Sequence, residues 1–166
     1  GLCKLMGGKK KFVDQLQSVF DRKNYDPANE PDIAYPYLFS YSKGEEWRTQ
    51  KLVKELLAEY FLNKPWGIPG NDDTGTMSCW AMFSMMGLYP DCPGVPEYTL
   101  TTPTFSKVTI HLDPKYYGSD RLVIETKGHG DYVKGVTVNG KKQNSMRINH
   151  KAIADGGTIS FTLGNK

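Results

Sequence analysis

Two short clusters of oxygen-bearing side chains are the residues of this sequence best suited to chemistry. One is Asn-Glu-Pro-Asp at residues 29–32, and the other is Asn-Asp-Asp-Thr at residues 71–74, framed by Gly70 and Gly75. Paired carboxylates of this kind carry out glycoside hydrolysis, one as acid and one as base or nucleophile. Carboxylate and amide oxygens are also the ligands that calcium prefers. The clusters therefore predict a glycan-hydrolysing site, a calcium site, or both.

Both clusters also allow a purely structural interpretation, because each comes just before a predicted helix. Asn29 and Asp73 are ordinary capping residues in such places, and the flanking glycines are ordinary turn residues. The start of a helix favours the ionised form of a nearby Asp, whereas a second Asp beside it raises the pKa of one of the two. The sequence leaves open which effect prevails for Asp72 and Asp73.

Helical periodicity marks four stretches before Pro96. Their apolar residues are Phe12, Val13, Leu16, Val19 and Phe20; Ile33, Ala34, Tyr37, Leu38 and Tyr41; Trp47, Val53, Leu56, Leu57, Tyr60 and Phe61; and Met77, Trp80, Ala81, Phe83, Met85 and Met86. Pro36 is expected to kink the second helix, and Gly87 to end the fourth. The fourth helix is apolar on nearly every side, which predicts burial of most faces and a core position for Cys79.

A period of two replaces the helical period after Pro96. The apolar residues that mark strands are Val108, Ile110 and Leu112; Leu122, Val123 and Ile124; Val136 and Val138; and Ile159, Phe161 and Leu163. Asn139-Gly140 predicts a two-residue hairpin, and Gly156-Gly157 another turn. Helices followed by a small antiparallel sheet predict an α+β fold. The helical segment is expected at residues 1–95 and the strands at 96–166, joined by the proline-rich residues 90–96.

The expected topology brings the two acidic clusters together. If consecutive helices are antiparallel hairpins, the loop from Asn63 to Gly75 returns to the end at which the second helix begins. Both clusters then open on the same face. Four helices of this kind, one of them apolar all round, look more like an arc of a larger ring than a closed bundle.

Bulk composition argues against several other classes of protein. The net charge is +3 and the basic residues are spread out, apart from Lys9-Lys10-Lys11, so no nucleic-acid-binding stripe is predicted. No apolar run reaches the length of a membrane span. The chain opens without an initiator Met, which we interpret as an internal start. The three cysteines lack the spacing of metal ligands, and the three histidines are interpreted as surface or core residues.

Several motifs of the sequence resemble those of glycoside hydrolase family 92, whose members are exo-acting α-mannosidases. The principal motif is residues 67–90, GIPGNDDTGTMSCWAMFSMMGLYP. Residues 28–31 (ANEP), 35–38 (YPYL) and 47–50 (WRTQ) are similar to the family's upstream motif. Residues 93–98 (PGVPEY) and 138–141 (VNGK) also match, so the resemblance covers essentially the whole chain.

The resemblance implies a calcium-dependent, inverting mannosidase with an amino-terminal β-sandwich and a carboxy-terminal (α/α)6 barrel. This chain would supply only the last barrel helices and the closing strands. By position the catalytic base falls on Asp73, with Asp72 as rival or partner, while Asn71 replaces an acid that some members carry. Asn71 and Glu30 would bind substrate, and Asn29, Glu30 and Asp73 would hold calcium.

The resemblance also implies partners and a location. The family's general acid lies upstream of these residues, so the isolated chain is expected to be inactive without the remainder of the polypeptide. The substrate would be a mannose-containing glycan such as an N-glycan, and the protein would be secreted, periplasmic or on the cell surface. Two rivals remain at this point: a non-catalytic carbohydrate-binding or scaffolding module, and another (α/α)6 enzyme such as a phosphorylase or glucosidase.

Overall fold

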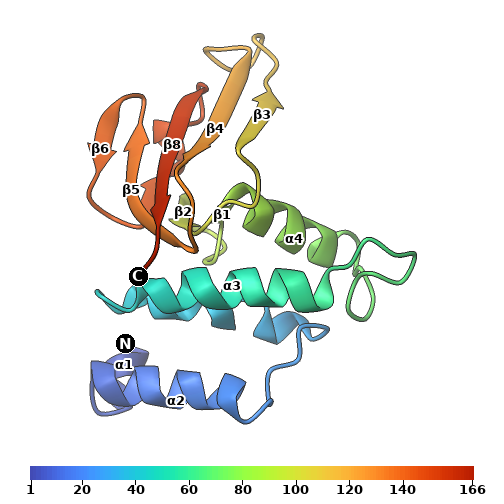
Figure 1. Ribbon diagram of the computed structural model, residues 1–166, viewed down its shortest axis with the longest axis vertical. Helices are drawn as coiled ribbons and strands as arrows, with labels where there is room; N and C mark the ends of the chain where they lie inside the picture. Colours follow the sequence, from blue (N-terminus) through green and yellow to red (C-terminus); the bar gives the residue numbers. More distant parts are fainter.

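The computed structural model describes residues 1–166, with the helices in one half of the molecule and the strands in the other (Figure 1). The helical elements are α1 (Leu2–Leu5), α2 (Lys9–Asp21), the 3₁₀ helices η1 (Glu30–Asp32) and η2 (Tyr35–Tyr41), α3 (Glu46–Tyr60), α4 (Thr76–Met86) and η3 (His150–Ala152). The strands are β1 (Leu88–Tyr89), β2 (Glu97–Leu100), β3 (Lys107–His111), β4 (Arg121–Lys127), β5 (Tyr132–Val138), β6 (Lys141–Gln143), β7 (Arg147–Asn149) and β8 (Gly157–Gly164). None of the helices has the length and hydropathy needed to cross a bilayer.

The helical half has two small apolar cores on either side of η2. Helix α2 buries Phe12, Val13 and Leu16 against Phe39. The second core joins α3 and α4 to η2 and consists of Tyr37, Val53, Leu56, Leu57, Trp80 and Ala81. The predicted helical patterns of α2, α3 and α4 are therefore confirmed, and their apolar stripes face η2 or each other.

The prediction of one kinked helix over residues 33–41 is wrong, because residues 35–41 form the 3₁₀ helix η2, which follows η1 at residues 30–32. Pro31 and Pro36 each lie in the first turn of a 3₁₀ helix. Proline has no N–H to donate, and its ring clashes with the carbonyl four residues earlier, so Pro36 disfavours a continuous α-helix through this segment. The tight, short helices leave Glu30 at the start of η1, on an exposed turn.

Helix α4 is less buried than its composition predicts. It buries Met77, Trp80, Ala81, Ser84 and Met86, but Ser78, Cys79 and Met82 lie exposed along one side. The predicted core position of Cys79 is therefore wrong, because these three positions share the face that no other part of the chain covers. All three cysteines are free thiols. Gly87 ends the helix in a left-handed conformation, as predicted.

The strands form two sheets, and the prediction of one small antiparallel sheet is only partly right. The first sheet has the order β1-β2-β7 and the second β3-β4-β8-β5-β6. In the second sheet β8 runs parallel to β4, because β8 returns after the excursion through β5, β6, β7 and η3 to insert between β4 and β5. Asn139 and Gly140 both have positive φ, 51° and 76°, and join β5 to β6 as the predicted two-residue turn.

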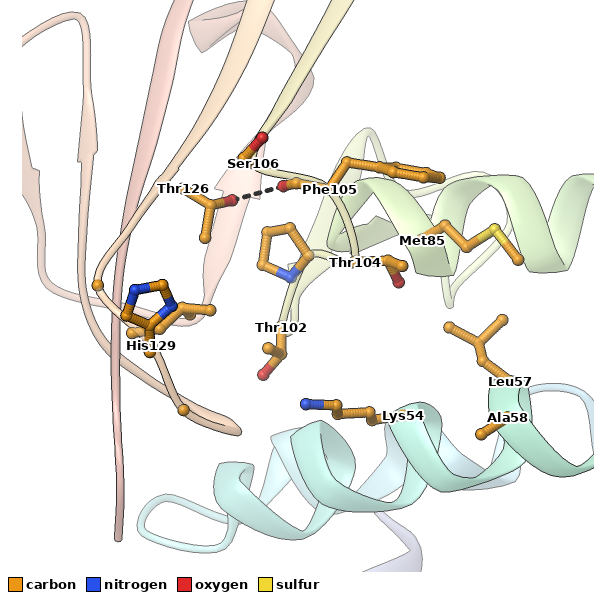
Figure 2. Close-up of a pocket in the computed structure, with 14 residues that line it drawn as sticks. Lys54, Leu57, Ala58, Met85, Thr102, Thr104, Phe105, Ser106, Thr126 and His129 are labelled. Atoms are coloured by element: carbon orange, nitrogen blue, oxygen red, sulfur yellow. Dashed lines mark hydrogen bonds between the residues drawn. The ribbon is translucent and has the colours of Figure 1, made fainter.

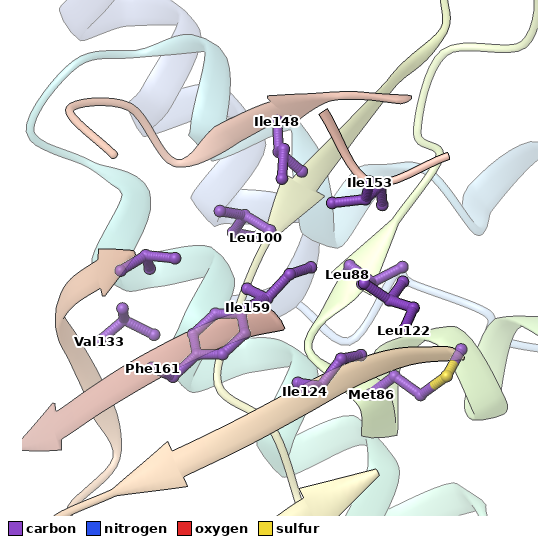
Figure 3. Close-up of a cluster of buried hydrophobic side chains, with 11 residues drawn as sticks. Met86, Leu88, Leu100, Leu122, Ile124, Val133, Ile148, Ile153, Ile159 and Phe161 are labelled. Carbon is purple, nitrogen blue, oxygen red and sulfur yellow. The ribbon is translucent and has the colours of Figure 1, made fainter. Parts of the chain in front are cut away.

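The largest apolar core lies between the two sheets and the end of α4 (Figure 3). Ile124, Ile159 and Phe161 on the inner strands of the five-stranded sheet pack with Leu100 and Ile148 of the three-stranded sheet. Ile159 and Phe161 are fully buried. Met86, the last residue of α4, and Leu88 of β1 are part of this core. The strand-bearing half therefore packs directly against the helix that follows the acidic loop.

One polar contact joins α3 to the strands, and a second group of contacts lies within the strand-bearing half. The buried Gln50 of α3 accepts a hydrogen bond from the backbone N–H of Val133 in β5 at 3.0 Å. Arg147 of β7 donates to the buried carboxylate of Asp91 at 2.9 Å, and the hydroxyl of Thr99 donates to the other Asp91 oxygen at 2.7 Å. A charge buried in this way is tolerated because it is paired and hydrogen-bonded.

Candidate active site

The loop between α3 and α4 carries the second acidic cluster in an unusual backbone conformation. Asp73 and Thr74 have φ values of 47° and 60°, and Gly75 follows at 95°. Left-handed residues other than glycine are uncommon and cost of the order of 1–3 kcal/mol each, although Asp tolerates the region better than most. The consecutive left-handed residues turn the chain into α4 and direct the Asp73 side chain away from the helix start.

Asp72, not Asp73, is the residue whose side chain accepts a hydrogen bond from a backbone N–H in the first turn of α4. Its Oδ1 accepts hydrogen bonds from the backbone N–H and the hydroxyl of Ser78, at 2.7 and 2.6 Å. Its carbonyl accepts from the N–H groups of Gly75 and Met77. The hydrogen bonds from Ser78 hold the pKa of Asp72 below its ordinary value. The structural interpretation of the cluster therefore applies to Asp72. The side chain of Asp73 makes no hydrogen bond to the helix.

The carboxyl group of Asp73 meets that of Glu30. A hydrogen bond with Glu30 is the main cause of a raised Asp73 pKa, with loss of hydration and the charges of Glu30 and Asp72 adding to it. The same hydrogen bond, with one from the backbone, lowers the pKa of Glu30. The two shifts have opposite directions because repulsion between two full negative charges favours the protonated form of one group of an interacting carboxyl pair.

The two acidic clusters are brought to one end of the helical half by contacts between α4 and the segment through η1 and η2 (Figure 1). The Trp80 indole donates to the carbonyl of Ile33 at 3.0 Å. The Tyr37 and Ser84 hydroxyls share a buried hydrogen bond of 2.6 Å. The expectation that both clusters lie on one face agrees with the meeting of Glu30 and Asp73.

The remaining residues of the clusters have separate places. Asn29 and Asn71 are exposed, and their side chains make no hydrogen bond within the chain. Asp32 accepts a hydrogen bond from the backbone N–H of Asp26 at 3.3 Å and so closes the turn before η1. Asn29 is next to Glu30 in the sequence, and Asn71 directly precedes the two aspartates.

The donor set at this site suits a hard cation but is incomplete. Glu30 and Asp73 supply carboxylate oxygens, and Asn29 supplies an amide oxygen, which are the donor types that calcium takes. Nowhere does the chain gather three or more His, Cys, Asp or Glu side chains into one metal-binding group. Calcium usually takes six to eight oxygen ligands. The residues present therefore fit part of a calcium shell, and water, carbonyl oxygens or groups outside this chain would have to supply the rest.

A separate cavity of about 590 Å³ lies between α3, α4 and the edge of the five-stranded sheet (Figure 2). Leu57, Met85 and Phe105 provide much of its apolar surface, and His129 lies at the opposite wall. None of the residues expected to do chemistry lines it. The acidic residues lie instead on the α3–α4 loop and at the start of η1, where Glu30 and Asp72 are exposed and Asp73 is half-buried.

Sequence reasoning overlooked one residue of this loop. The indole of Trp66 is 77% exposed, on the same loop as Asp72 and Asp73. The signal that could have found it is the placement of a large aromatic residue between Pro65 and Gly67, among residues that otherwise form turns.

Glycoside hydrolases use two carboxyl groups that flank the scissile bond about 5–9.5 Å apart, so Asp73 and Glu30, which interact directly, can supply only one of the two. The comparison with known families agrees: residues 1–165 match the glycosyl hydrolase family 92 catalytic domain. The chain therefore belongs to glycosyl hydrolase family 92.

Individual relatives support the same assignment. An uncharacterized secreted glycosidase of Arthroderma benhamiae is 32% identical over 99% of this chain. The structure is similar to that of a GH92 α-mannosidase of Bacteroides thetaiotaomicron, with a TM-score of 0.87 and 29% identity over 96% of the chain. An inverting GH92 mannosidase of the same species aligns over 94% of the chain, with a TM-score of 0.72 and 27% identity. The chain spans only 21% of the Arthroderma protein and 21–22% of the two solved chains.

Proposed function

We propose that this chain is the base-bearing part of an inverting exo-α-mannosidase, which hydrolyses α-mannosidic bonds of glycans such as N-glycans. The single observation that carries the proposal is the engagement of the Asp72 carboxylate by Ser78 of α4, which leaves Asp73 as the loop carboxylate that the helix does not engage. Family membership and the relatives named α-mannosidases support the choice of sugar. One of these relatives has been solved in complex with mannoimidazole, which supports a mannose-binding site.

Asp73 is the proposed catalytic base. Its ionised carboxylate takes a proton from a water molecule as the water oxygen forms a bond to the anomeric carbon. The bond from that carbon to the glycosidic oxygen breaks, and the leaving oxygen takes a proton from a general acid outside this chain. Attack from the side opposite the leaving group inverts the anomeric configuration. The raised pKa of Asp73 makes it a better proton acceptor than an ordinary aspartate, provided that the pH keeps it ionised.

The other site residues hold the substrate and the loop in place. Asn71 and Glu30 are proposed to bind mannose hydroxyls, since both are exposed beside Asp73. Asp72 is a positioning residue, because its bonds to Ser78 fix the turn that orients Asp73. Asn29, Glu30 and Asp73 are the residues that would hold calcium, which when bound supplies positive charge that orients sugar hydroxyls.

The chain is proposed to work only as part of a longer polypeptide. The exposed side of α4 carries Ser78, Cys79 and Met82, the last 51% exposed, and we propose that further barrel helices pack there. We assign residues 1–95 to the end of an (α/α)6 barrel and residues 96–166 to the closing strands. An amino-terminal β-sandwich and upstream helices would complete the pocket, so the isolated chain should be inactive. The name of the Arthroderma relative supports a secreted, periplasmic or cell-surface location.

The test is to assay the full-length protein and the isolated chain on α-mannosides, with product configuration followed by NMR. The full-length protein should release β-mannose as the first product, and the isolated chain should release none. Mannose released first as the α-anomer would contradict an inverting mechanism. Binding of mannosides without turnover by the full-length protein would favour a non-catalytic carbohydrate-binding module instead.

A further inference from the structure

Trp66 is the large aromatic side chain of the acidic loop that nothing in the structure covers. Its indole is 77% exposed. The other two tryptophans are engaged: Trp80 is buried and stacks on Phe61 at 5.2 Å, and the Trp47 ring is covered by Arg48 and Lys166. An indole that stays in water does not contribute the large hydrophobic free energy that its burial would give. Of the three, Trp66 is therefore the one with a free face for a ligand.

A tight turn fixes the position of Trp66. The backbone N–H of Leu62 donates to the carbonyl of Gly67 at 2.8 Å, and the N–H of Gly67 donates to the carbonyl of Lys64 at 3.0 Å. A Cβ atom at Gly67 would lie 1.7 Å from the Leu62 carbonyl oxygen, so no side chain is tolerated there. Trp66 lies inside this closed turn, and its indole is held outward by the backbone.

The same loop is also fixed at its acidic end. Gly70 packs so closely on Ala28 that a Cβ there would lie 2.7 Å from the alanine Cβ. Ala28 lies two residues before Glu30, whose carboxyl group meets Asp73. A fully extended chain from Trp66 to Asp73 would span at most about 25 Å, and the folded loop brings them closer. The separation is therefore within the length of a short oligosaccharide.

We propose that Trp66 determines specificity by stacking on a sugar of the leaving group, on the side of the cleaved bond away from the terminal mannose. The inference rests on the proposed mannosidase function and defines its substrate class as di- and oligosaccharides, in preference to mannosides with small leaving groups. The apolar C–H face of a pyranose packs on the indole face, while the sugar hydroxyls stay in water or reach polar groups. Leu62 and Ile68, 42% and 37% exposed, are further exposed apolar residues of the same α3–α4 loop.

The test compares two substrates that differ only in whether a leaving-group sugar is present. Full-length enzyme carrying Trp66→Ala is assayed on α-mannobiose and on α-mannosyl fluoride. We expect kcat/KM for the disaccharide to fall about tenfold, which is about 1.4 kcal/mol, mostly through a higher KM. For the fluoride we expect a change of less than about twofold, because that substrate has nothing to stack. Trp66→Phe should retain most of the disaccharide activity.

The matched control is Tyr116→Ala, because Tyr116 is 70% exposed and lies at the β3–β4 turn, away from the acidic loop. This variant should leave kcat/KM unchanged for both substrates. Unchanged kinetics of Trp66→Ala on both substrates would overturn the inference. An equal loss on both, together with a lower melting temperature, would also overturn it by showing that Trp66 packs against the rest of the polypeptide. A wild-type enzyme inactive on both substrates would instead refute the proposed mannosidase function.

Discussion

The two aspartates of the acidic loop should respond very differently to the same change of one carboxylate to an amide. Asp73→Asn removes the group proposed to take the proton from water. Asp72→Asn preserves an oxygen at Oδ1, which can still accept from the N–H and hydroxyl of Ser78. Each variant replaces a carboxylate with an amide of nearly the same volume and shape. A difference in activity between the two variants therefore reports the different roles of Asp72 and Asp73.

The expected magnitudes follow from these contacts. General-base catalysis typically contributes 10²–10⁴-fold, so kcat of Asp73→Asn should fall by about that factor. The amide oxygen of Asn can accept the same two hydrogen bonds from Ser78, so kcat of Asp72→Asn should remain within about fivefold of the wild type. Both variants should melt close to the wild-type temperature, because neither side chain is buried in a core.

The assay is steady-state hydrolysis of an α-mannoside by the full-length enzyme, with and without sodium azide. Azide attacks the anomeric carbon without giving up a proton, so it should restore turnover to Asp73→Asn and yield a β-mannosyl azide. Azide should not accelerate Asp72→Asn. This rescue separates loss of a base from misfolding, which azide cannot repair.

Two results would refute the reasoning. If Asp72→Asn lost as much activity as Asp73→Asn and was the variant that azide rescued, the base would be Asp72 and the capping contact would be secondary. If Asp73→Asn remained within about fivefold of the wild type, neither its pairing with Glu30 nor its place in the loop could indicate a base.

Four further outcomes are expected. A chelator should abolish activity of the full-length enzyme and calcium should restore it; activity that persists without metal would remove the proposed calcium role. Calcium affinity, measured by titration calorimetry, should weaken as the pH falls through the raised pKa of Asp73, because protonation removes a ligand charge. Gly67→Ala should disorder the α3–α4 loop, detectable by faster amide exchange there, since its Cβ would overlap the Leu62 carbonyl. Asp91→Ala should lower the free energy of unfolding by about 3 kcal/mol in a denaturant titration, because it leaves Arg147 without its buried partner.

Much of the local structure could be predicted from the sequence, because local patterns decide it. The apolar periods of α2, α3 and α4 and the left-handed turn at Asn139-Gly140 are properties of neighbouring residues. The exception is residues 33–41, where apolar spacing suggested an α-helix. There the missing N–H and the ring of Pro36 outweigh the pattern and leave a 3₁₀ helix.

Burial and strand pairing were harder to predict, because they depend on parts of the chain that are far apart. Cys79 lies in a helix that is apolar all round, yet nothing in this chain covers its side of α4. The parallel pairing of β4 with β8 depends on how the chain returns after β7, which no local pattern encodes.

For the acidic loop, the sequence by itself determined that Asn29, Glu30, Asp72 and Asp73 offer the oxygen chemistry of a glycosidase, and the motif resemblance determined which sugar to expect. The sequence could not assign separate roles to Asp72 and Asp73, because either of them could cap α4. Only the tertiary structure decided that Asp72 binds Ser78 while Asp73 meets Glu30. The physical reason is the left-handed backbone at Asp73, held in place by the packing of α4 on η2, which turns one carboxylate toward the helix and the other toward the site.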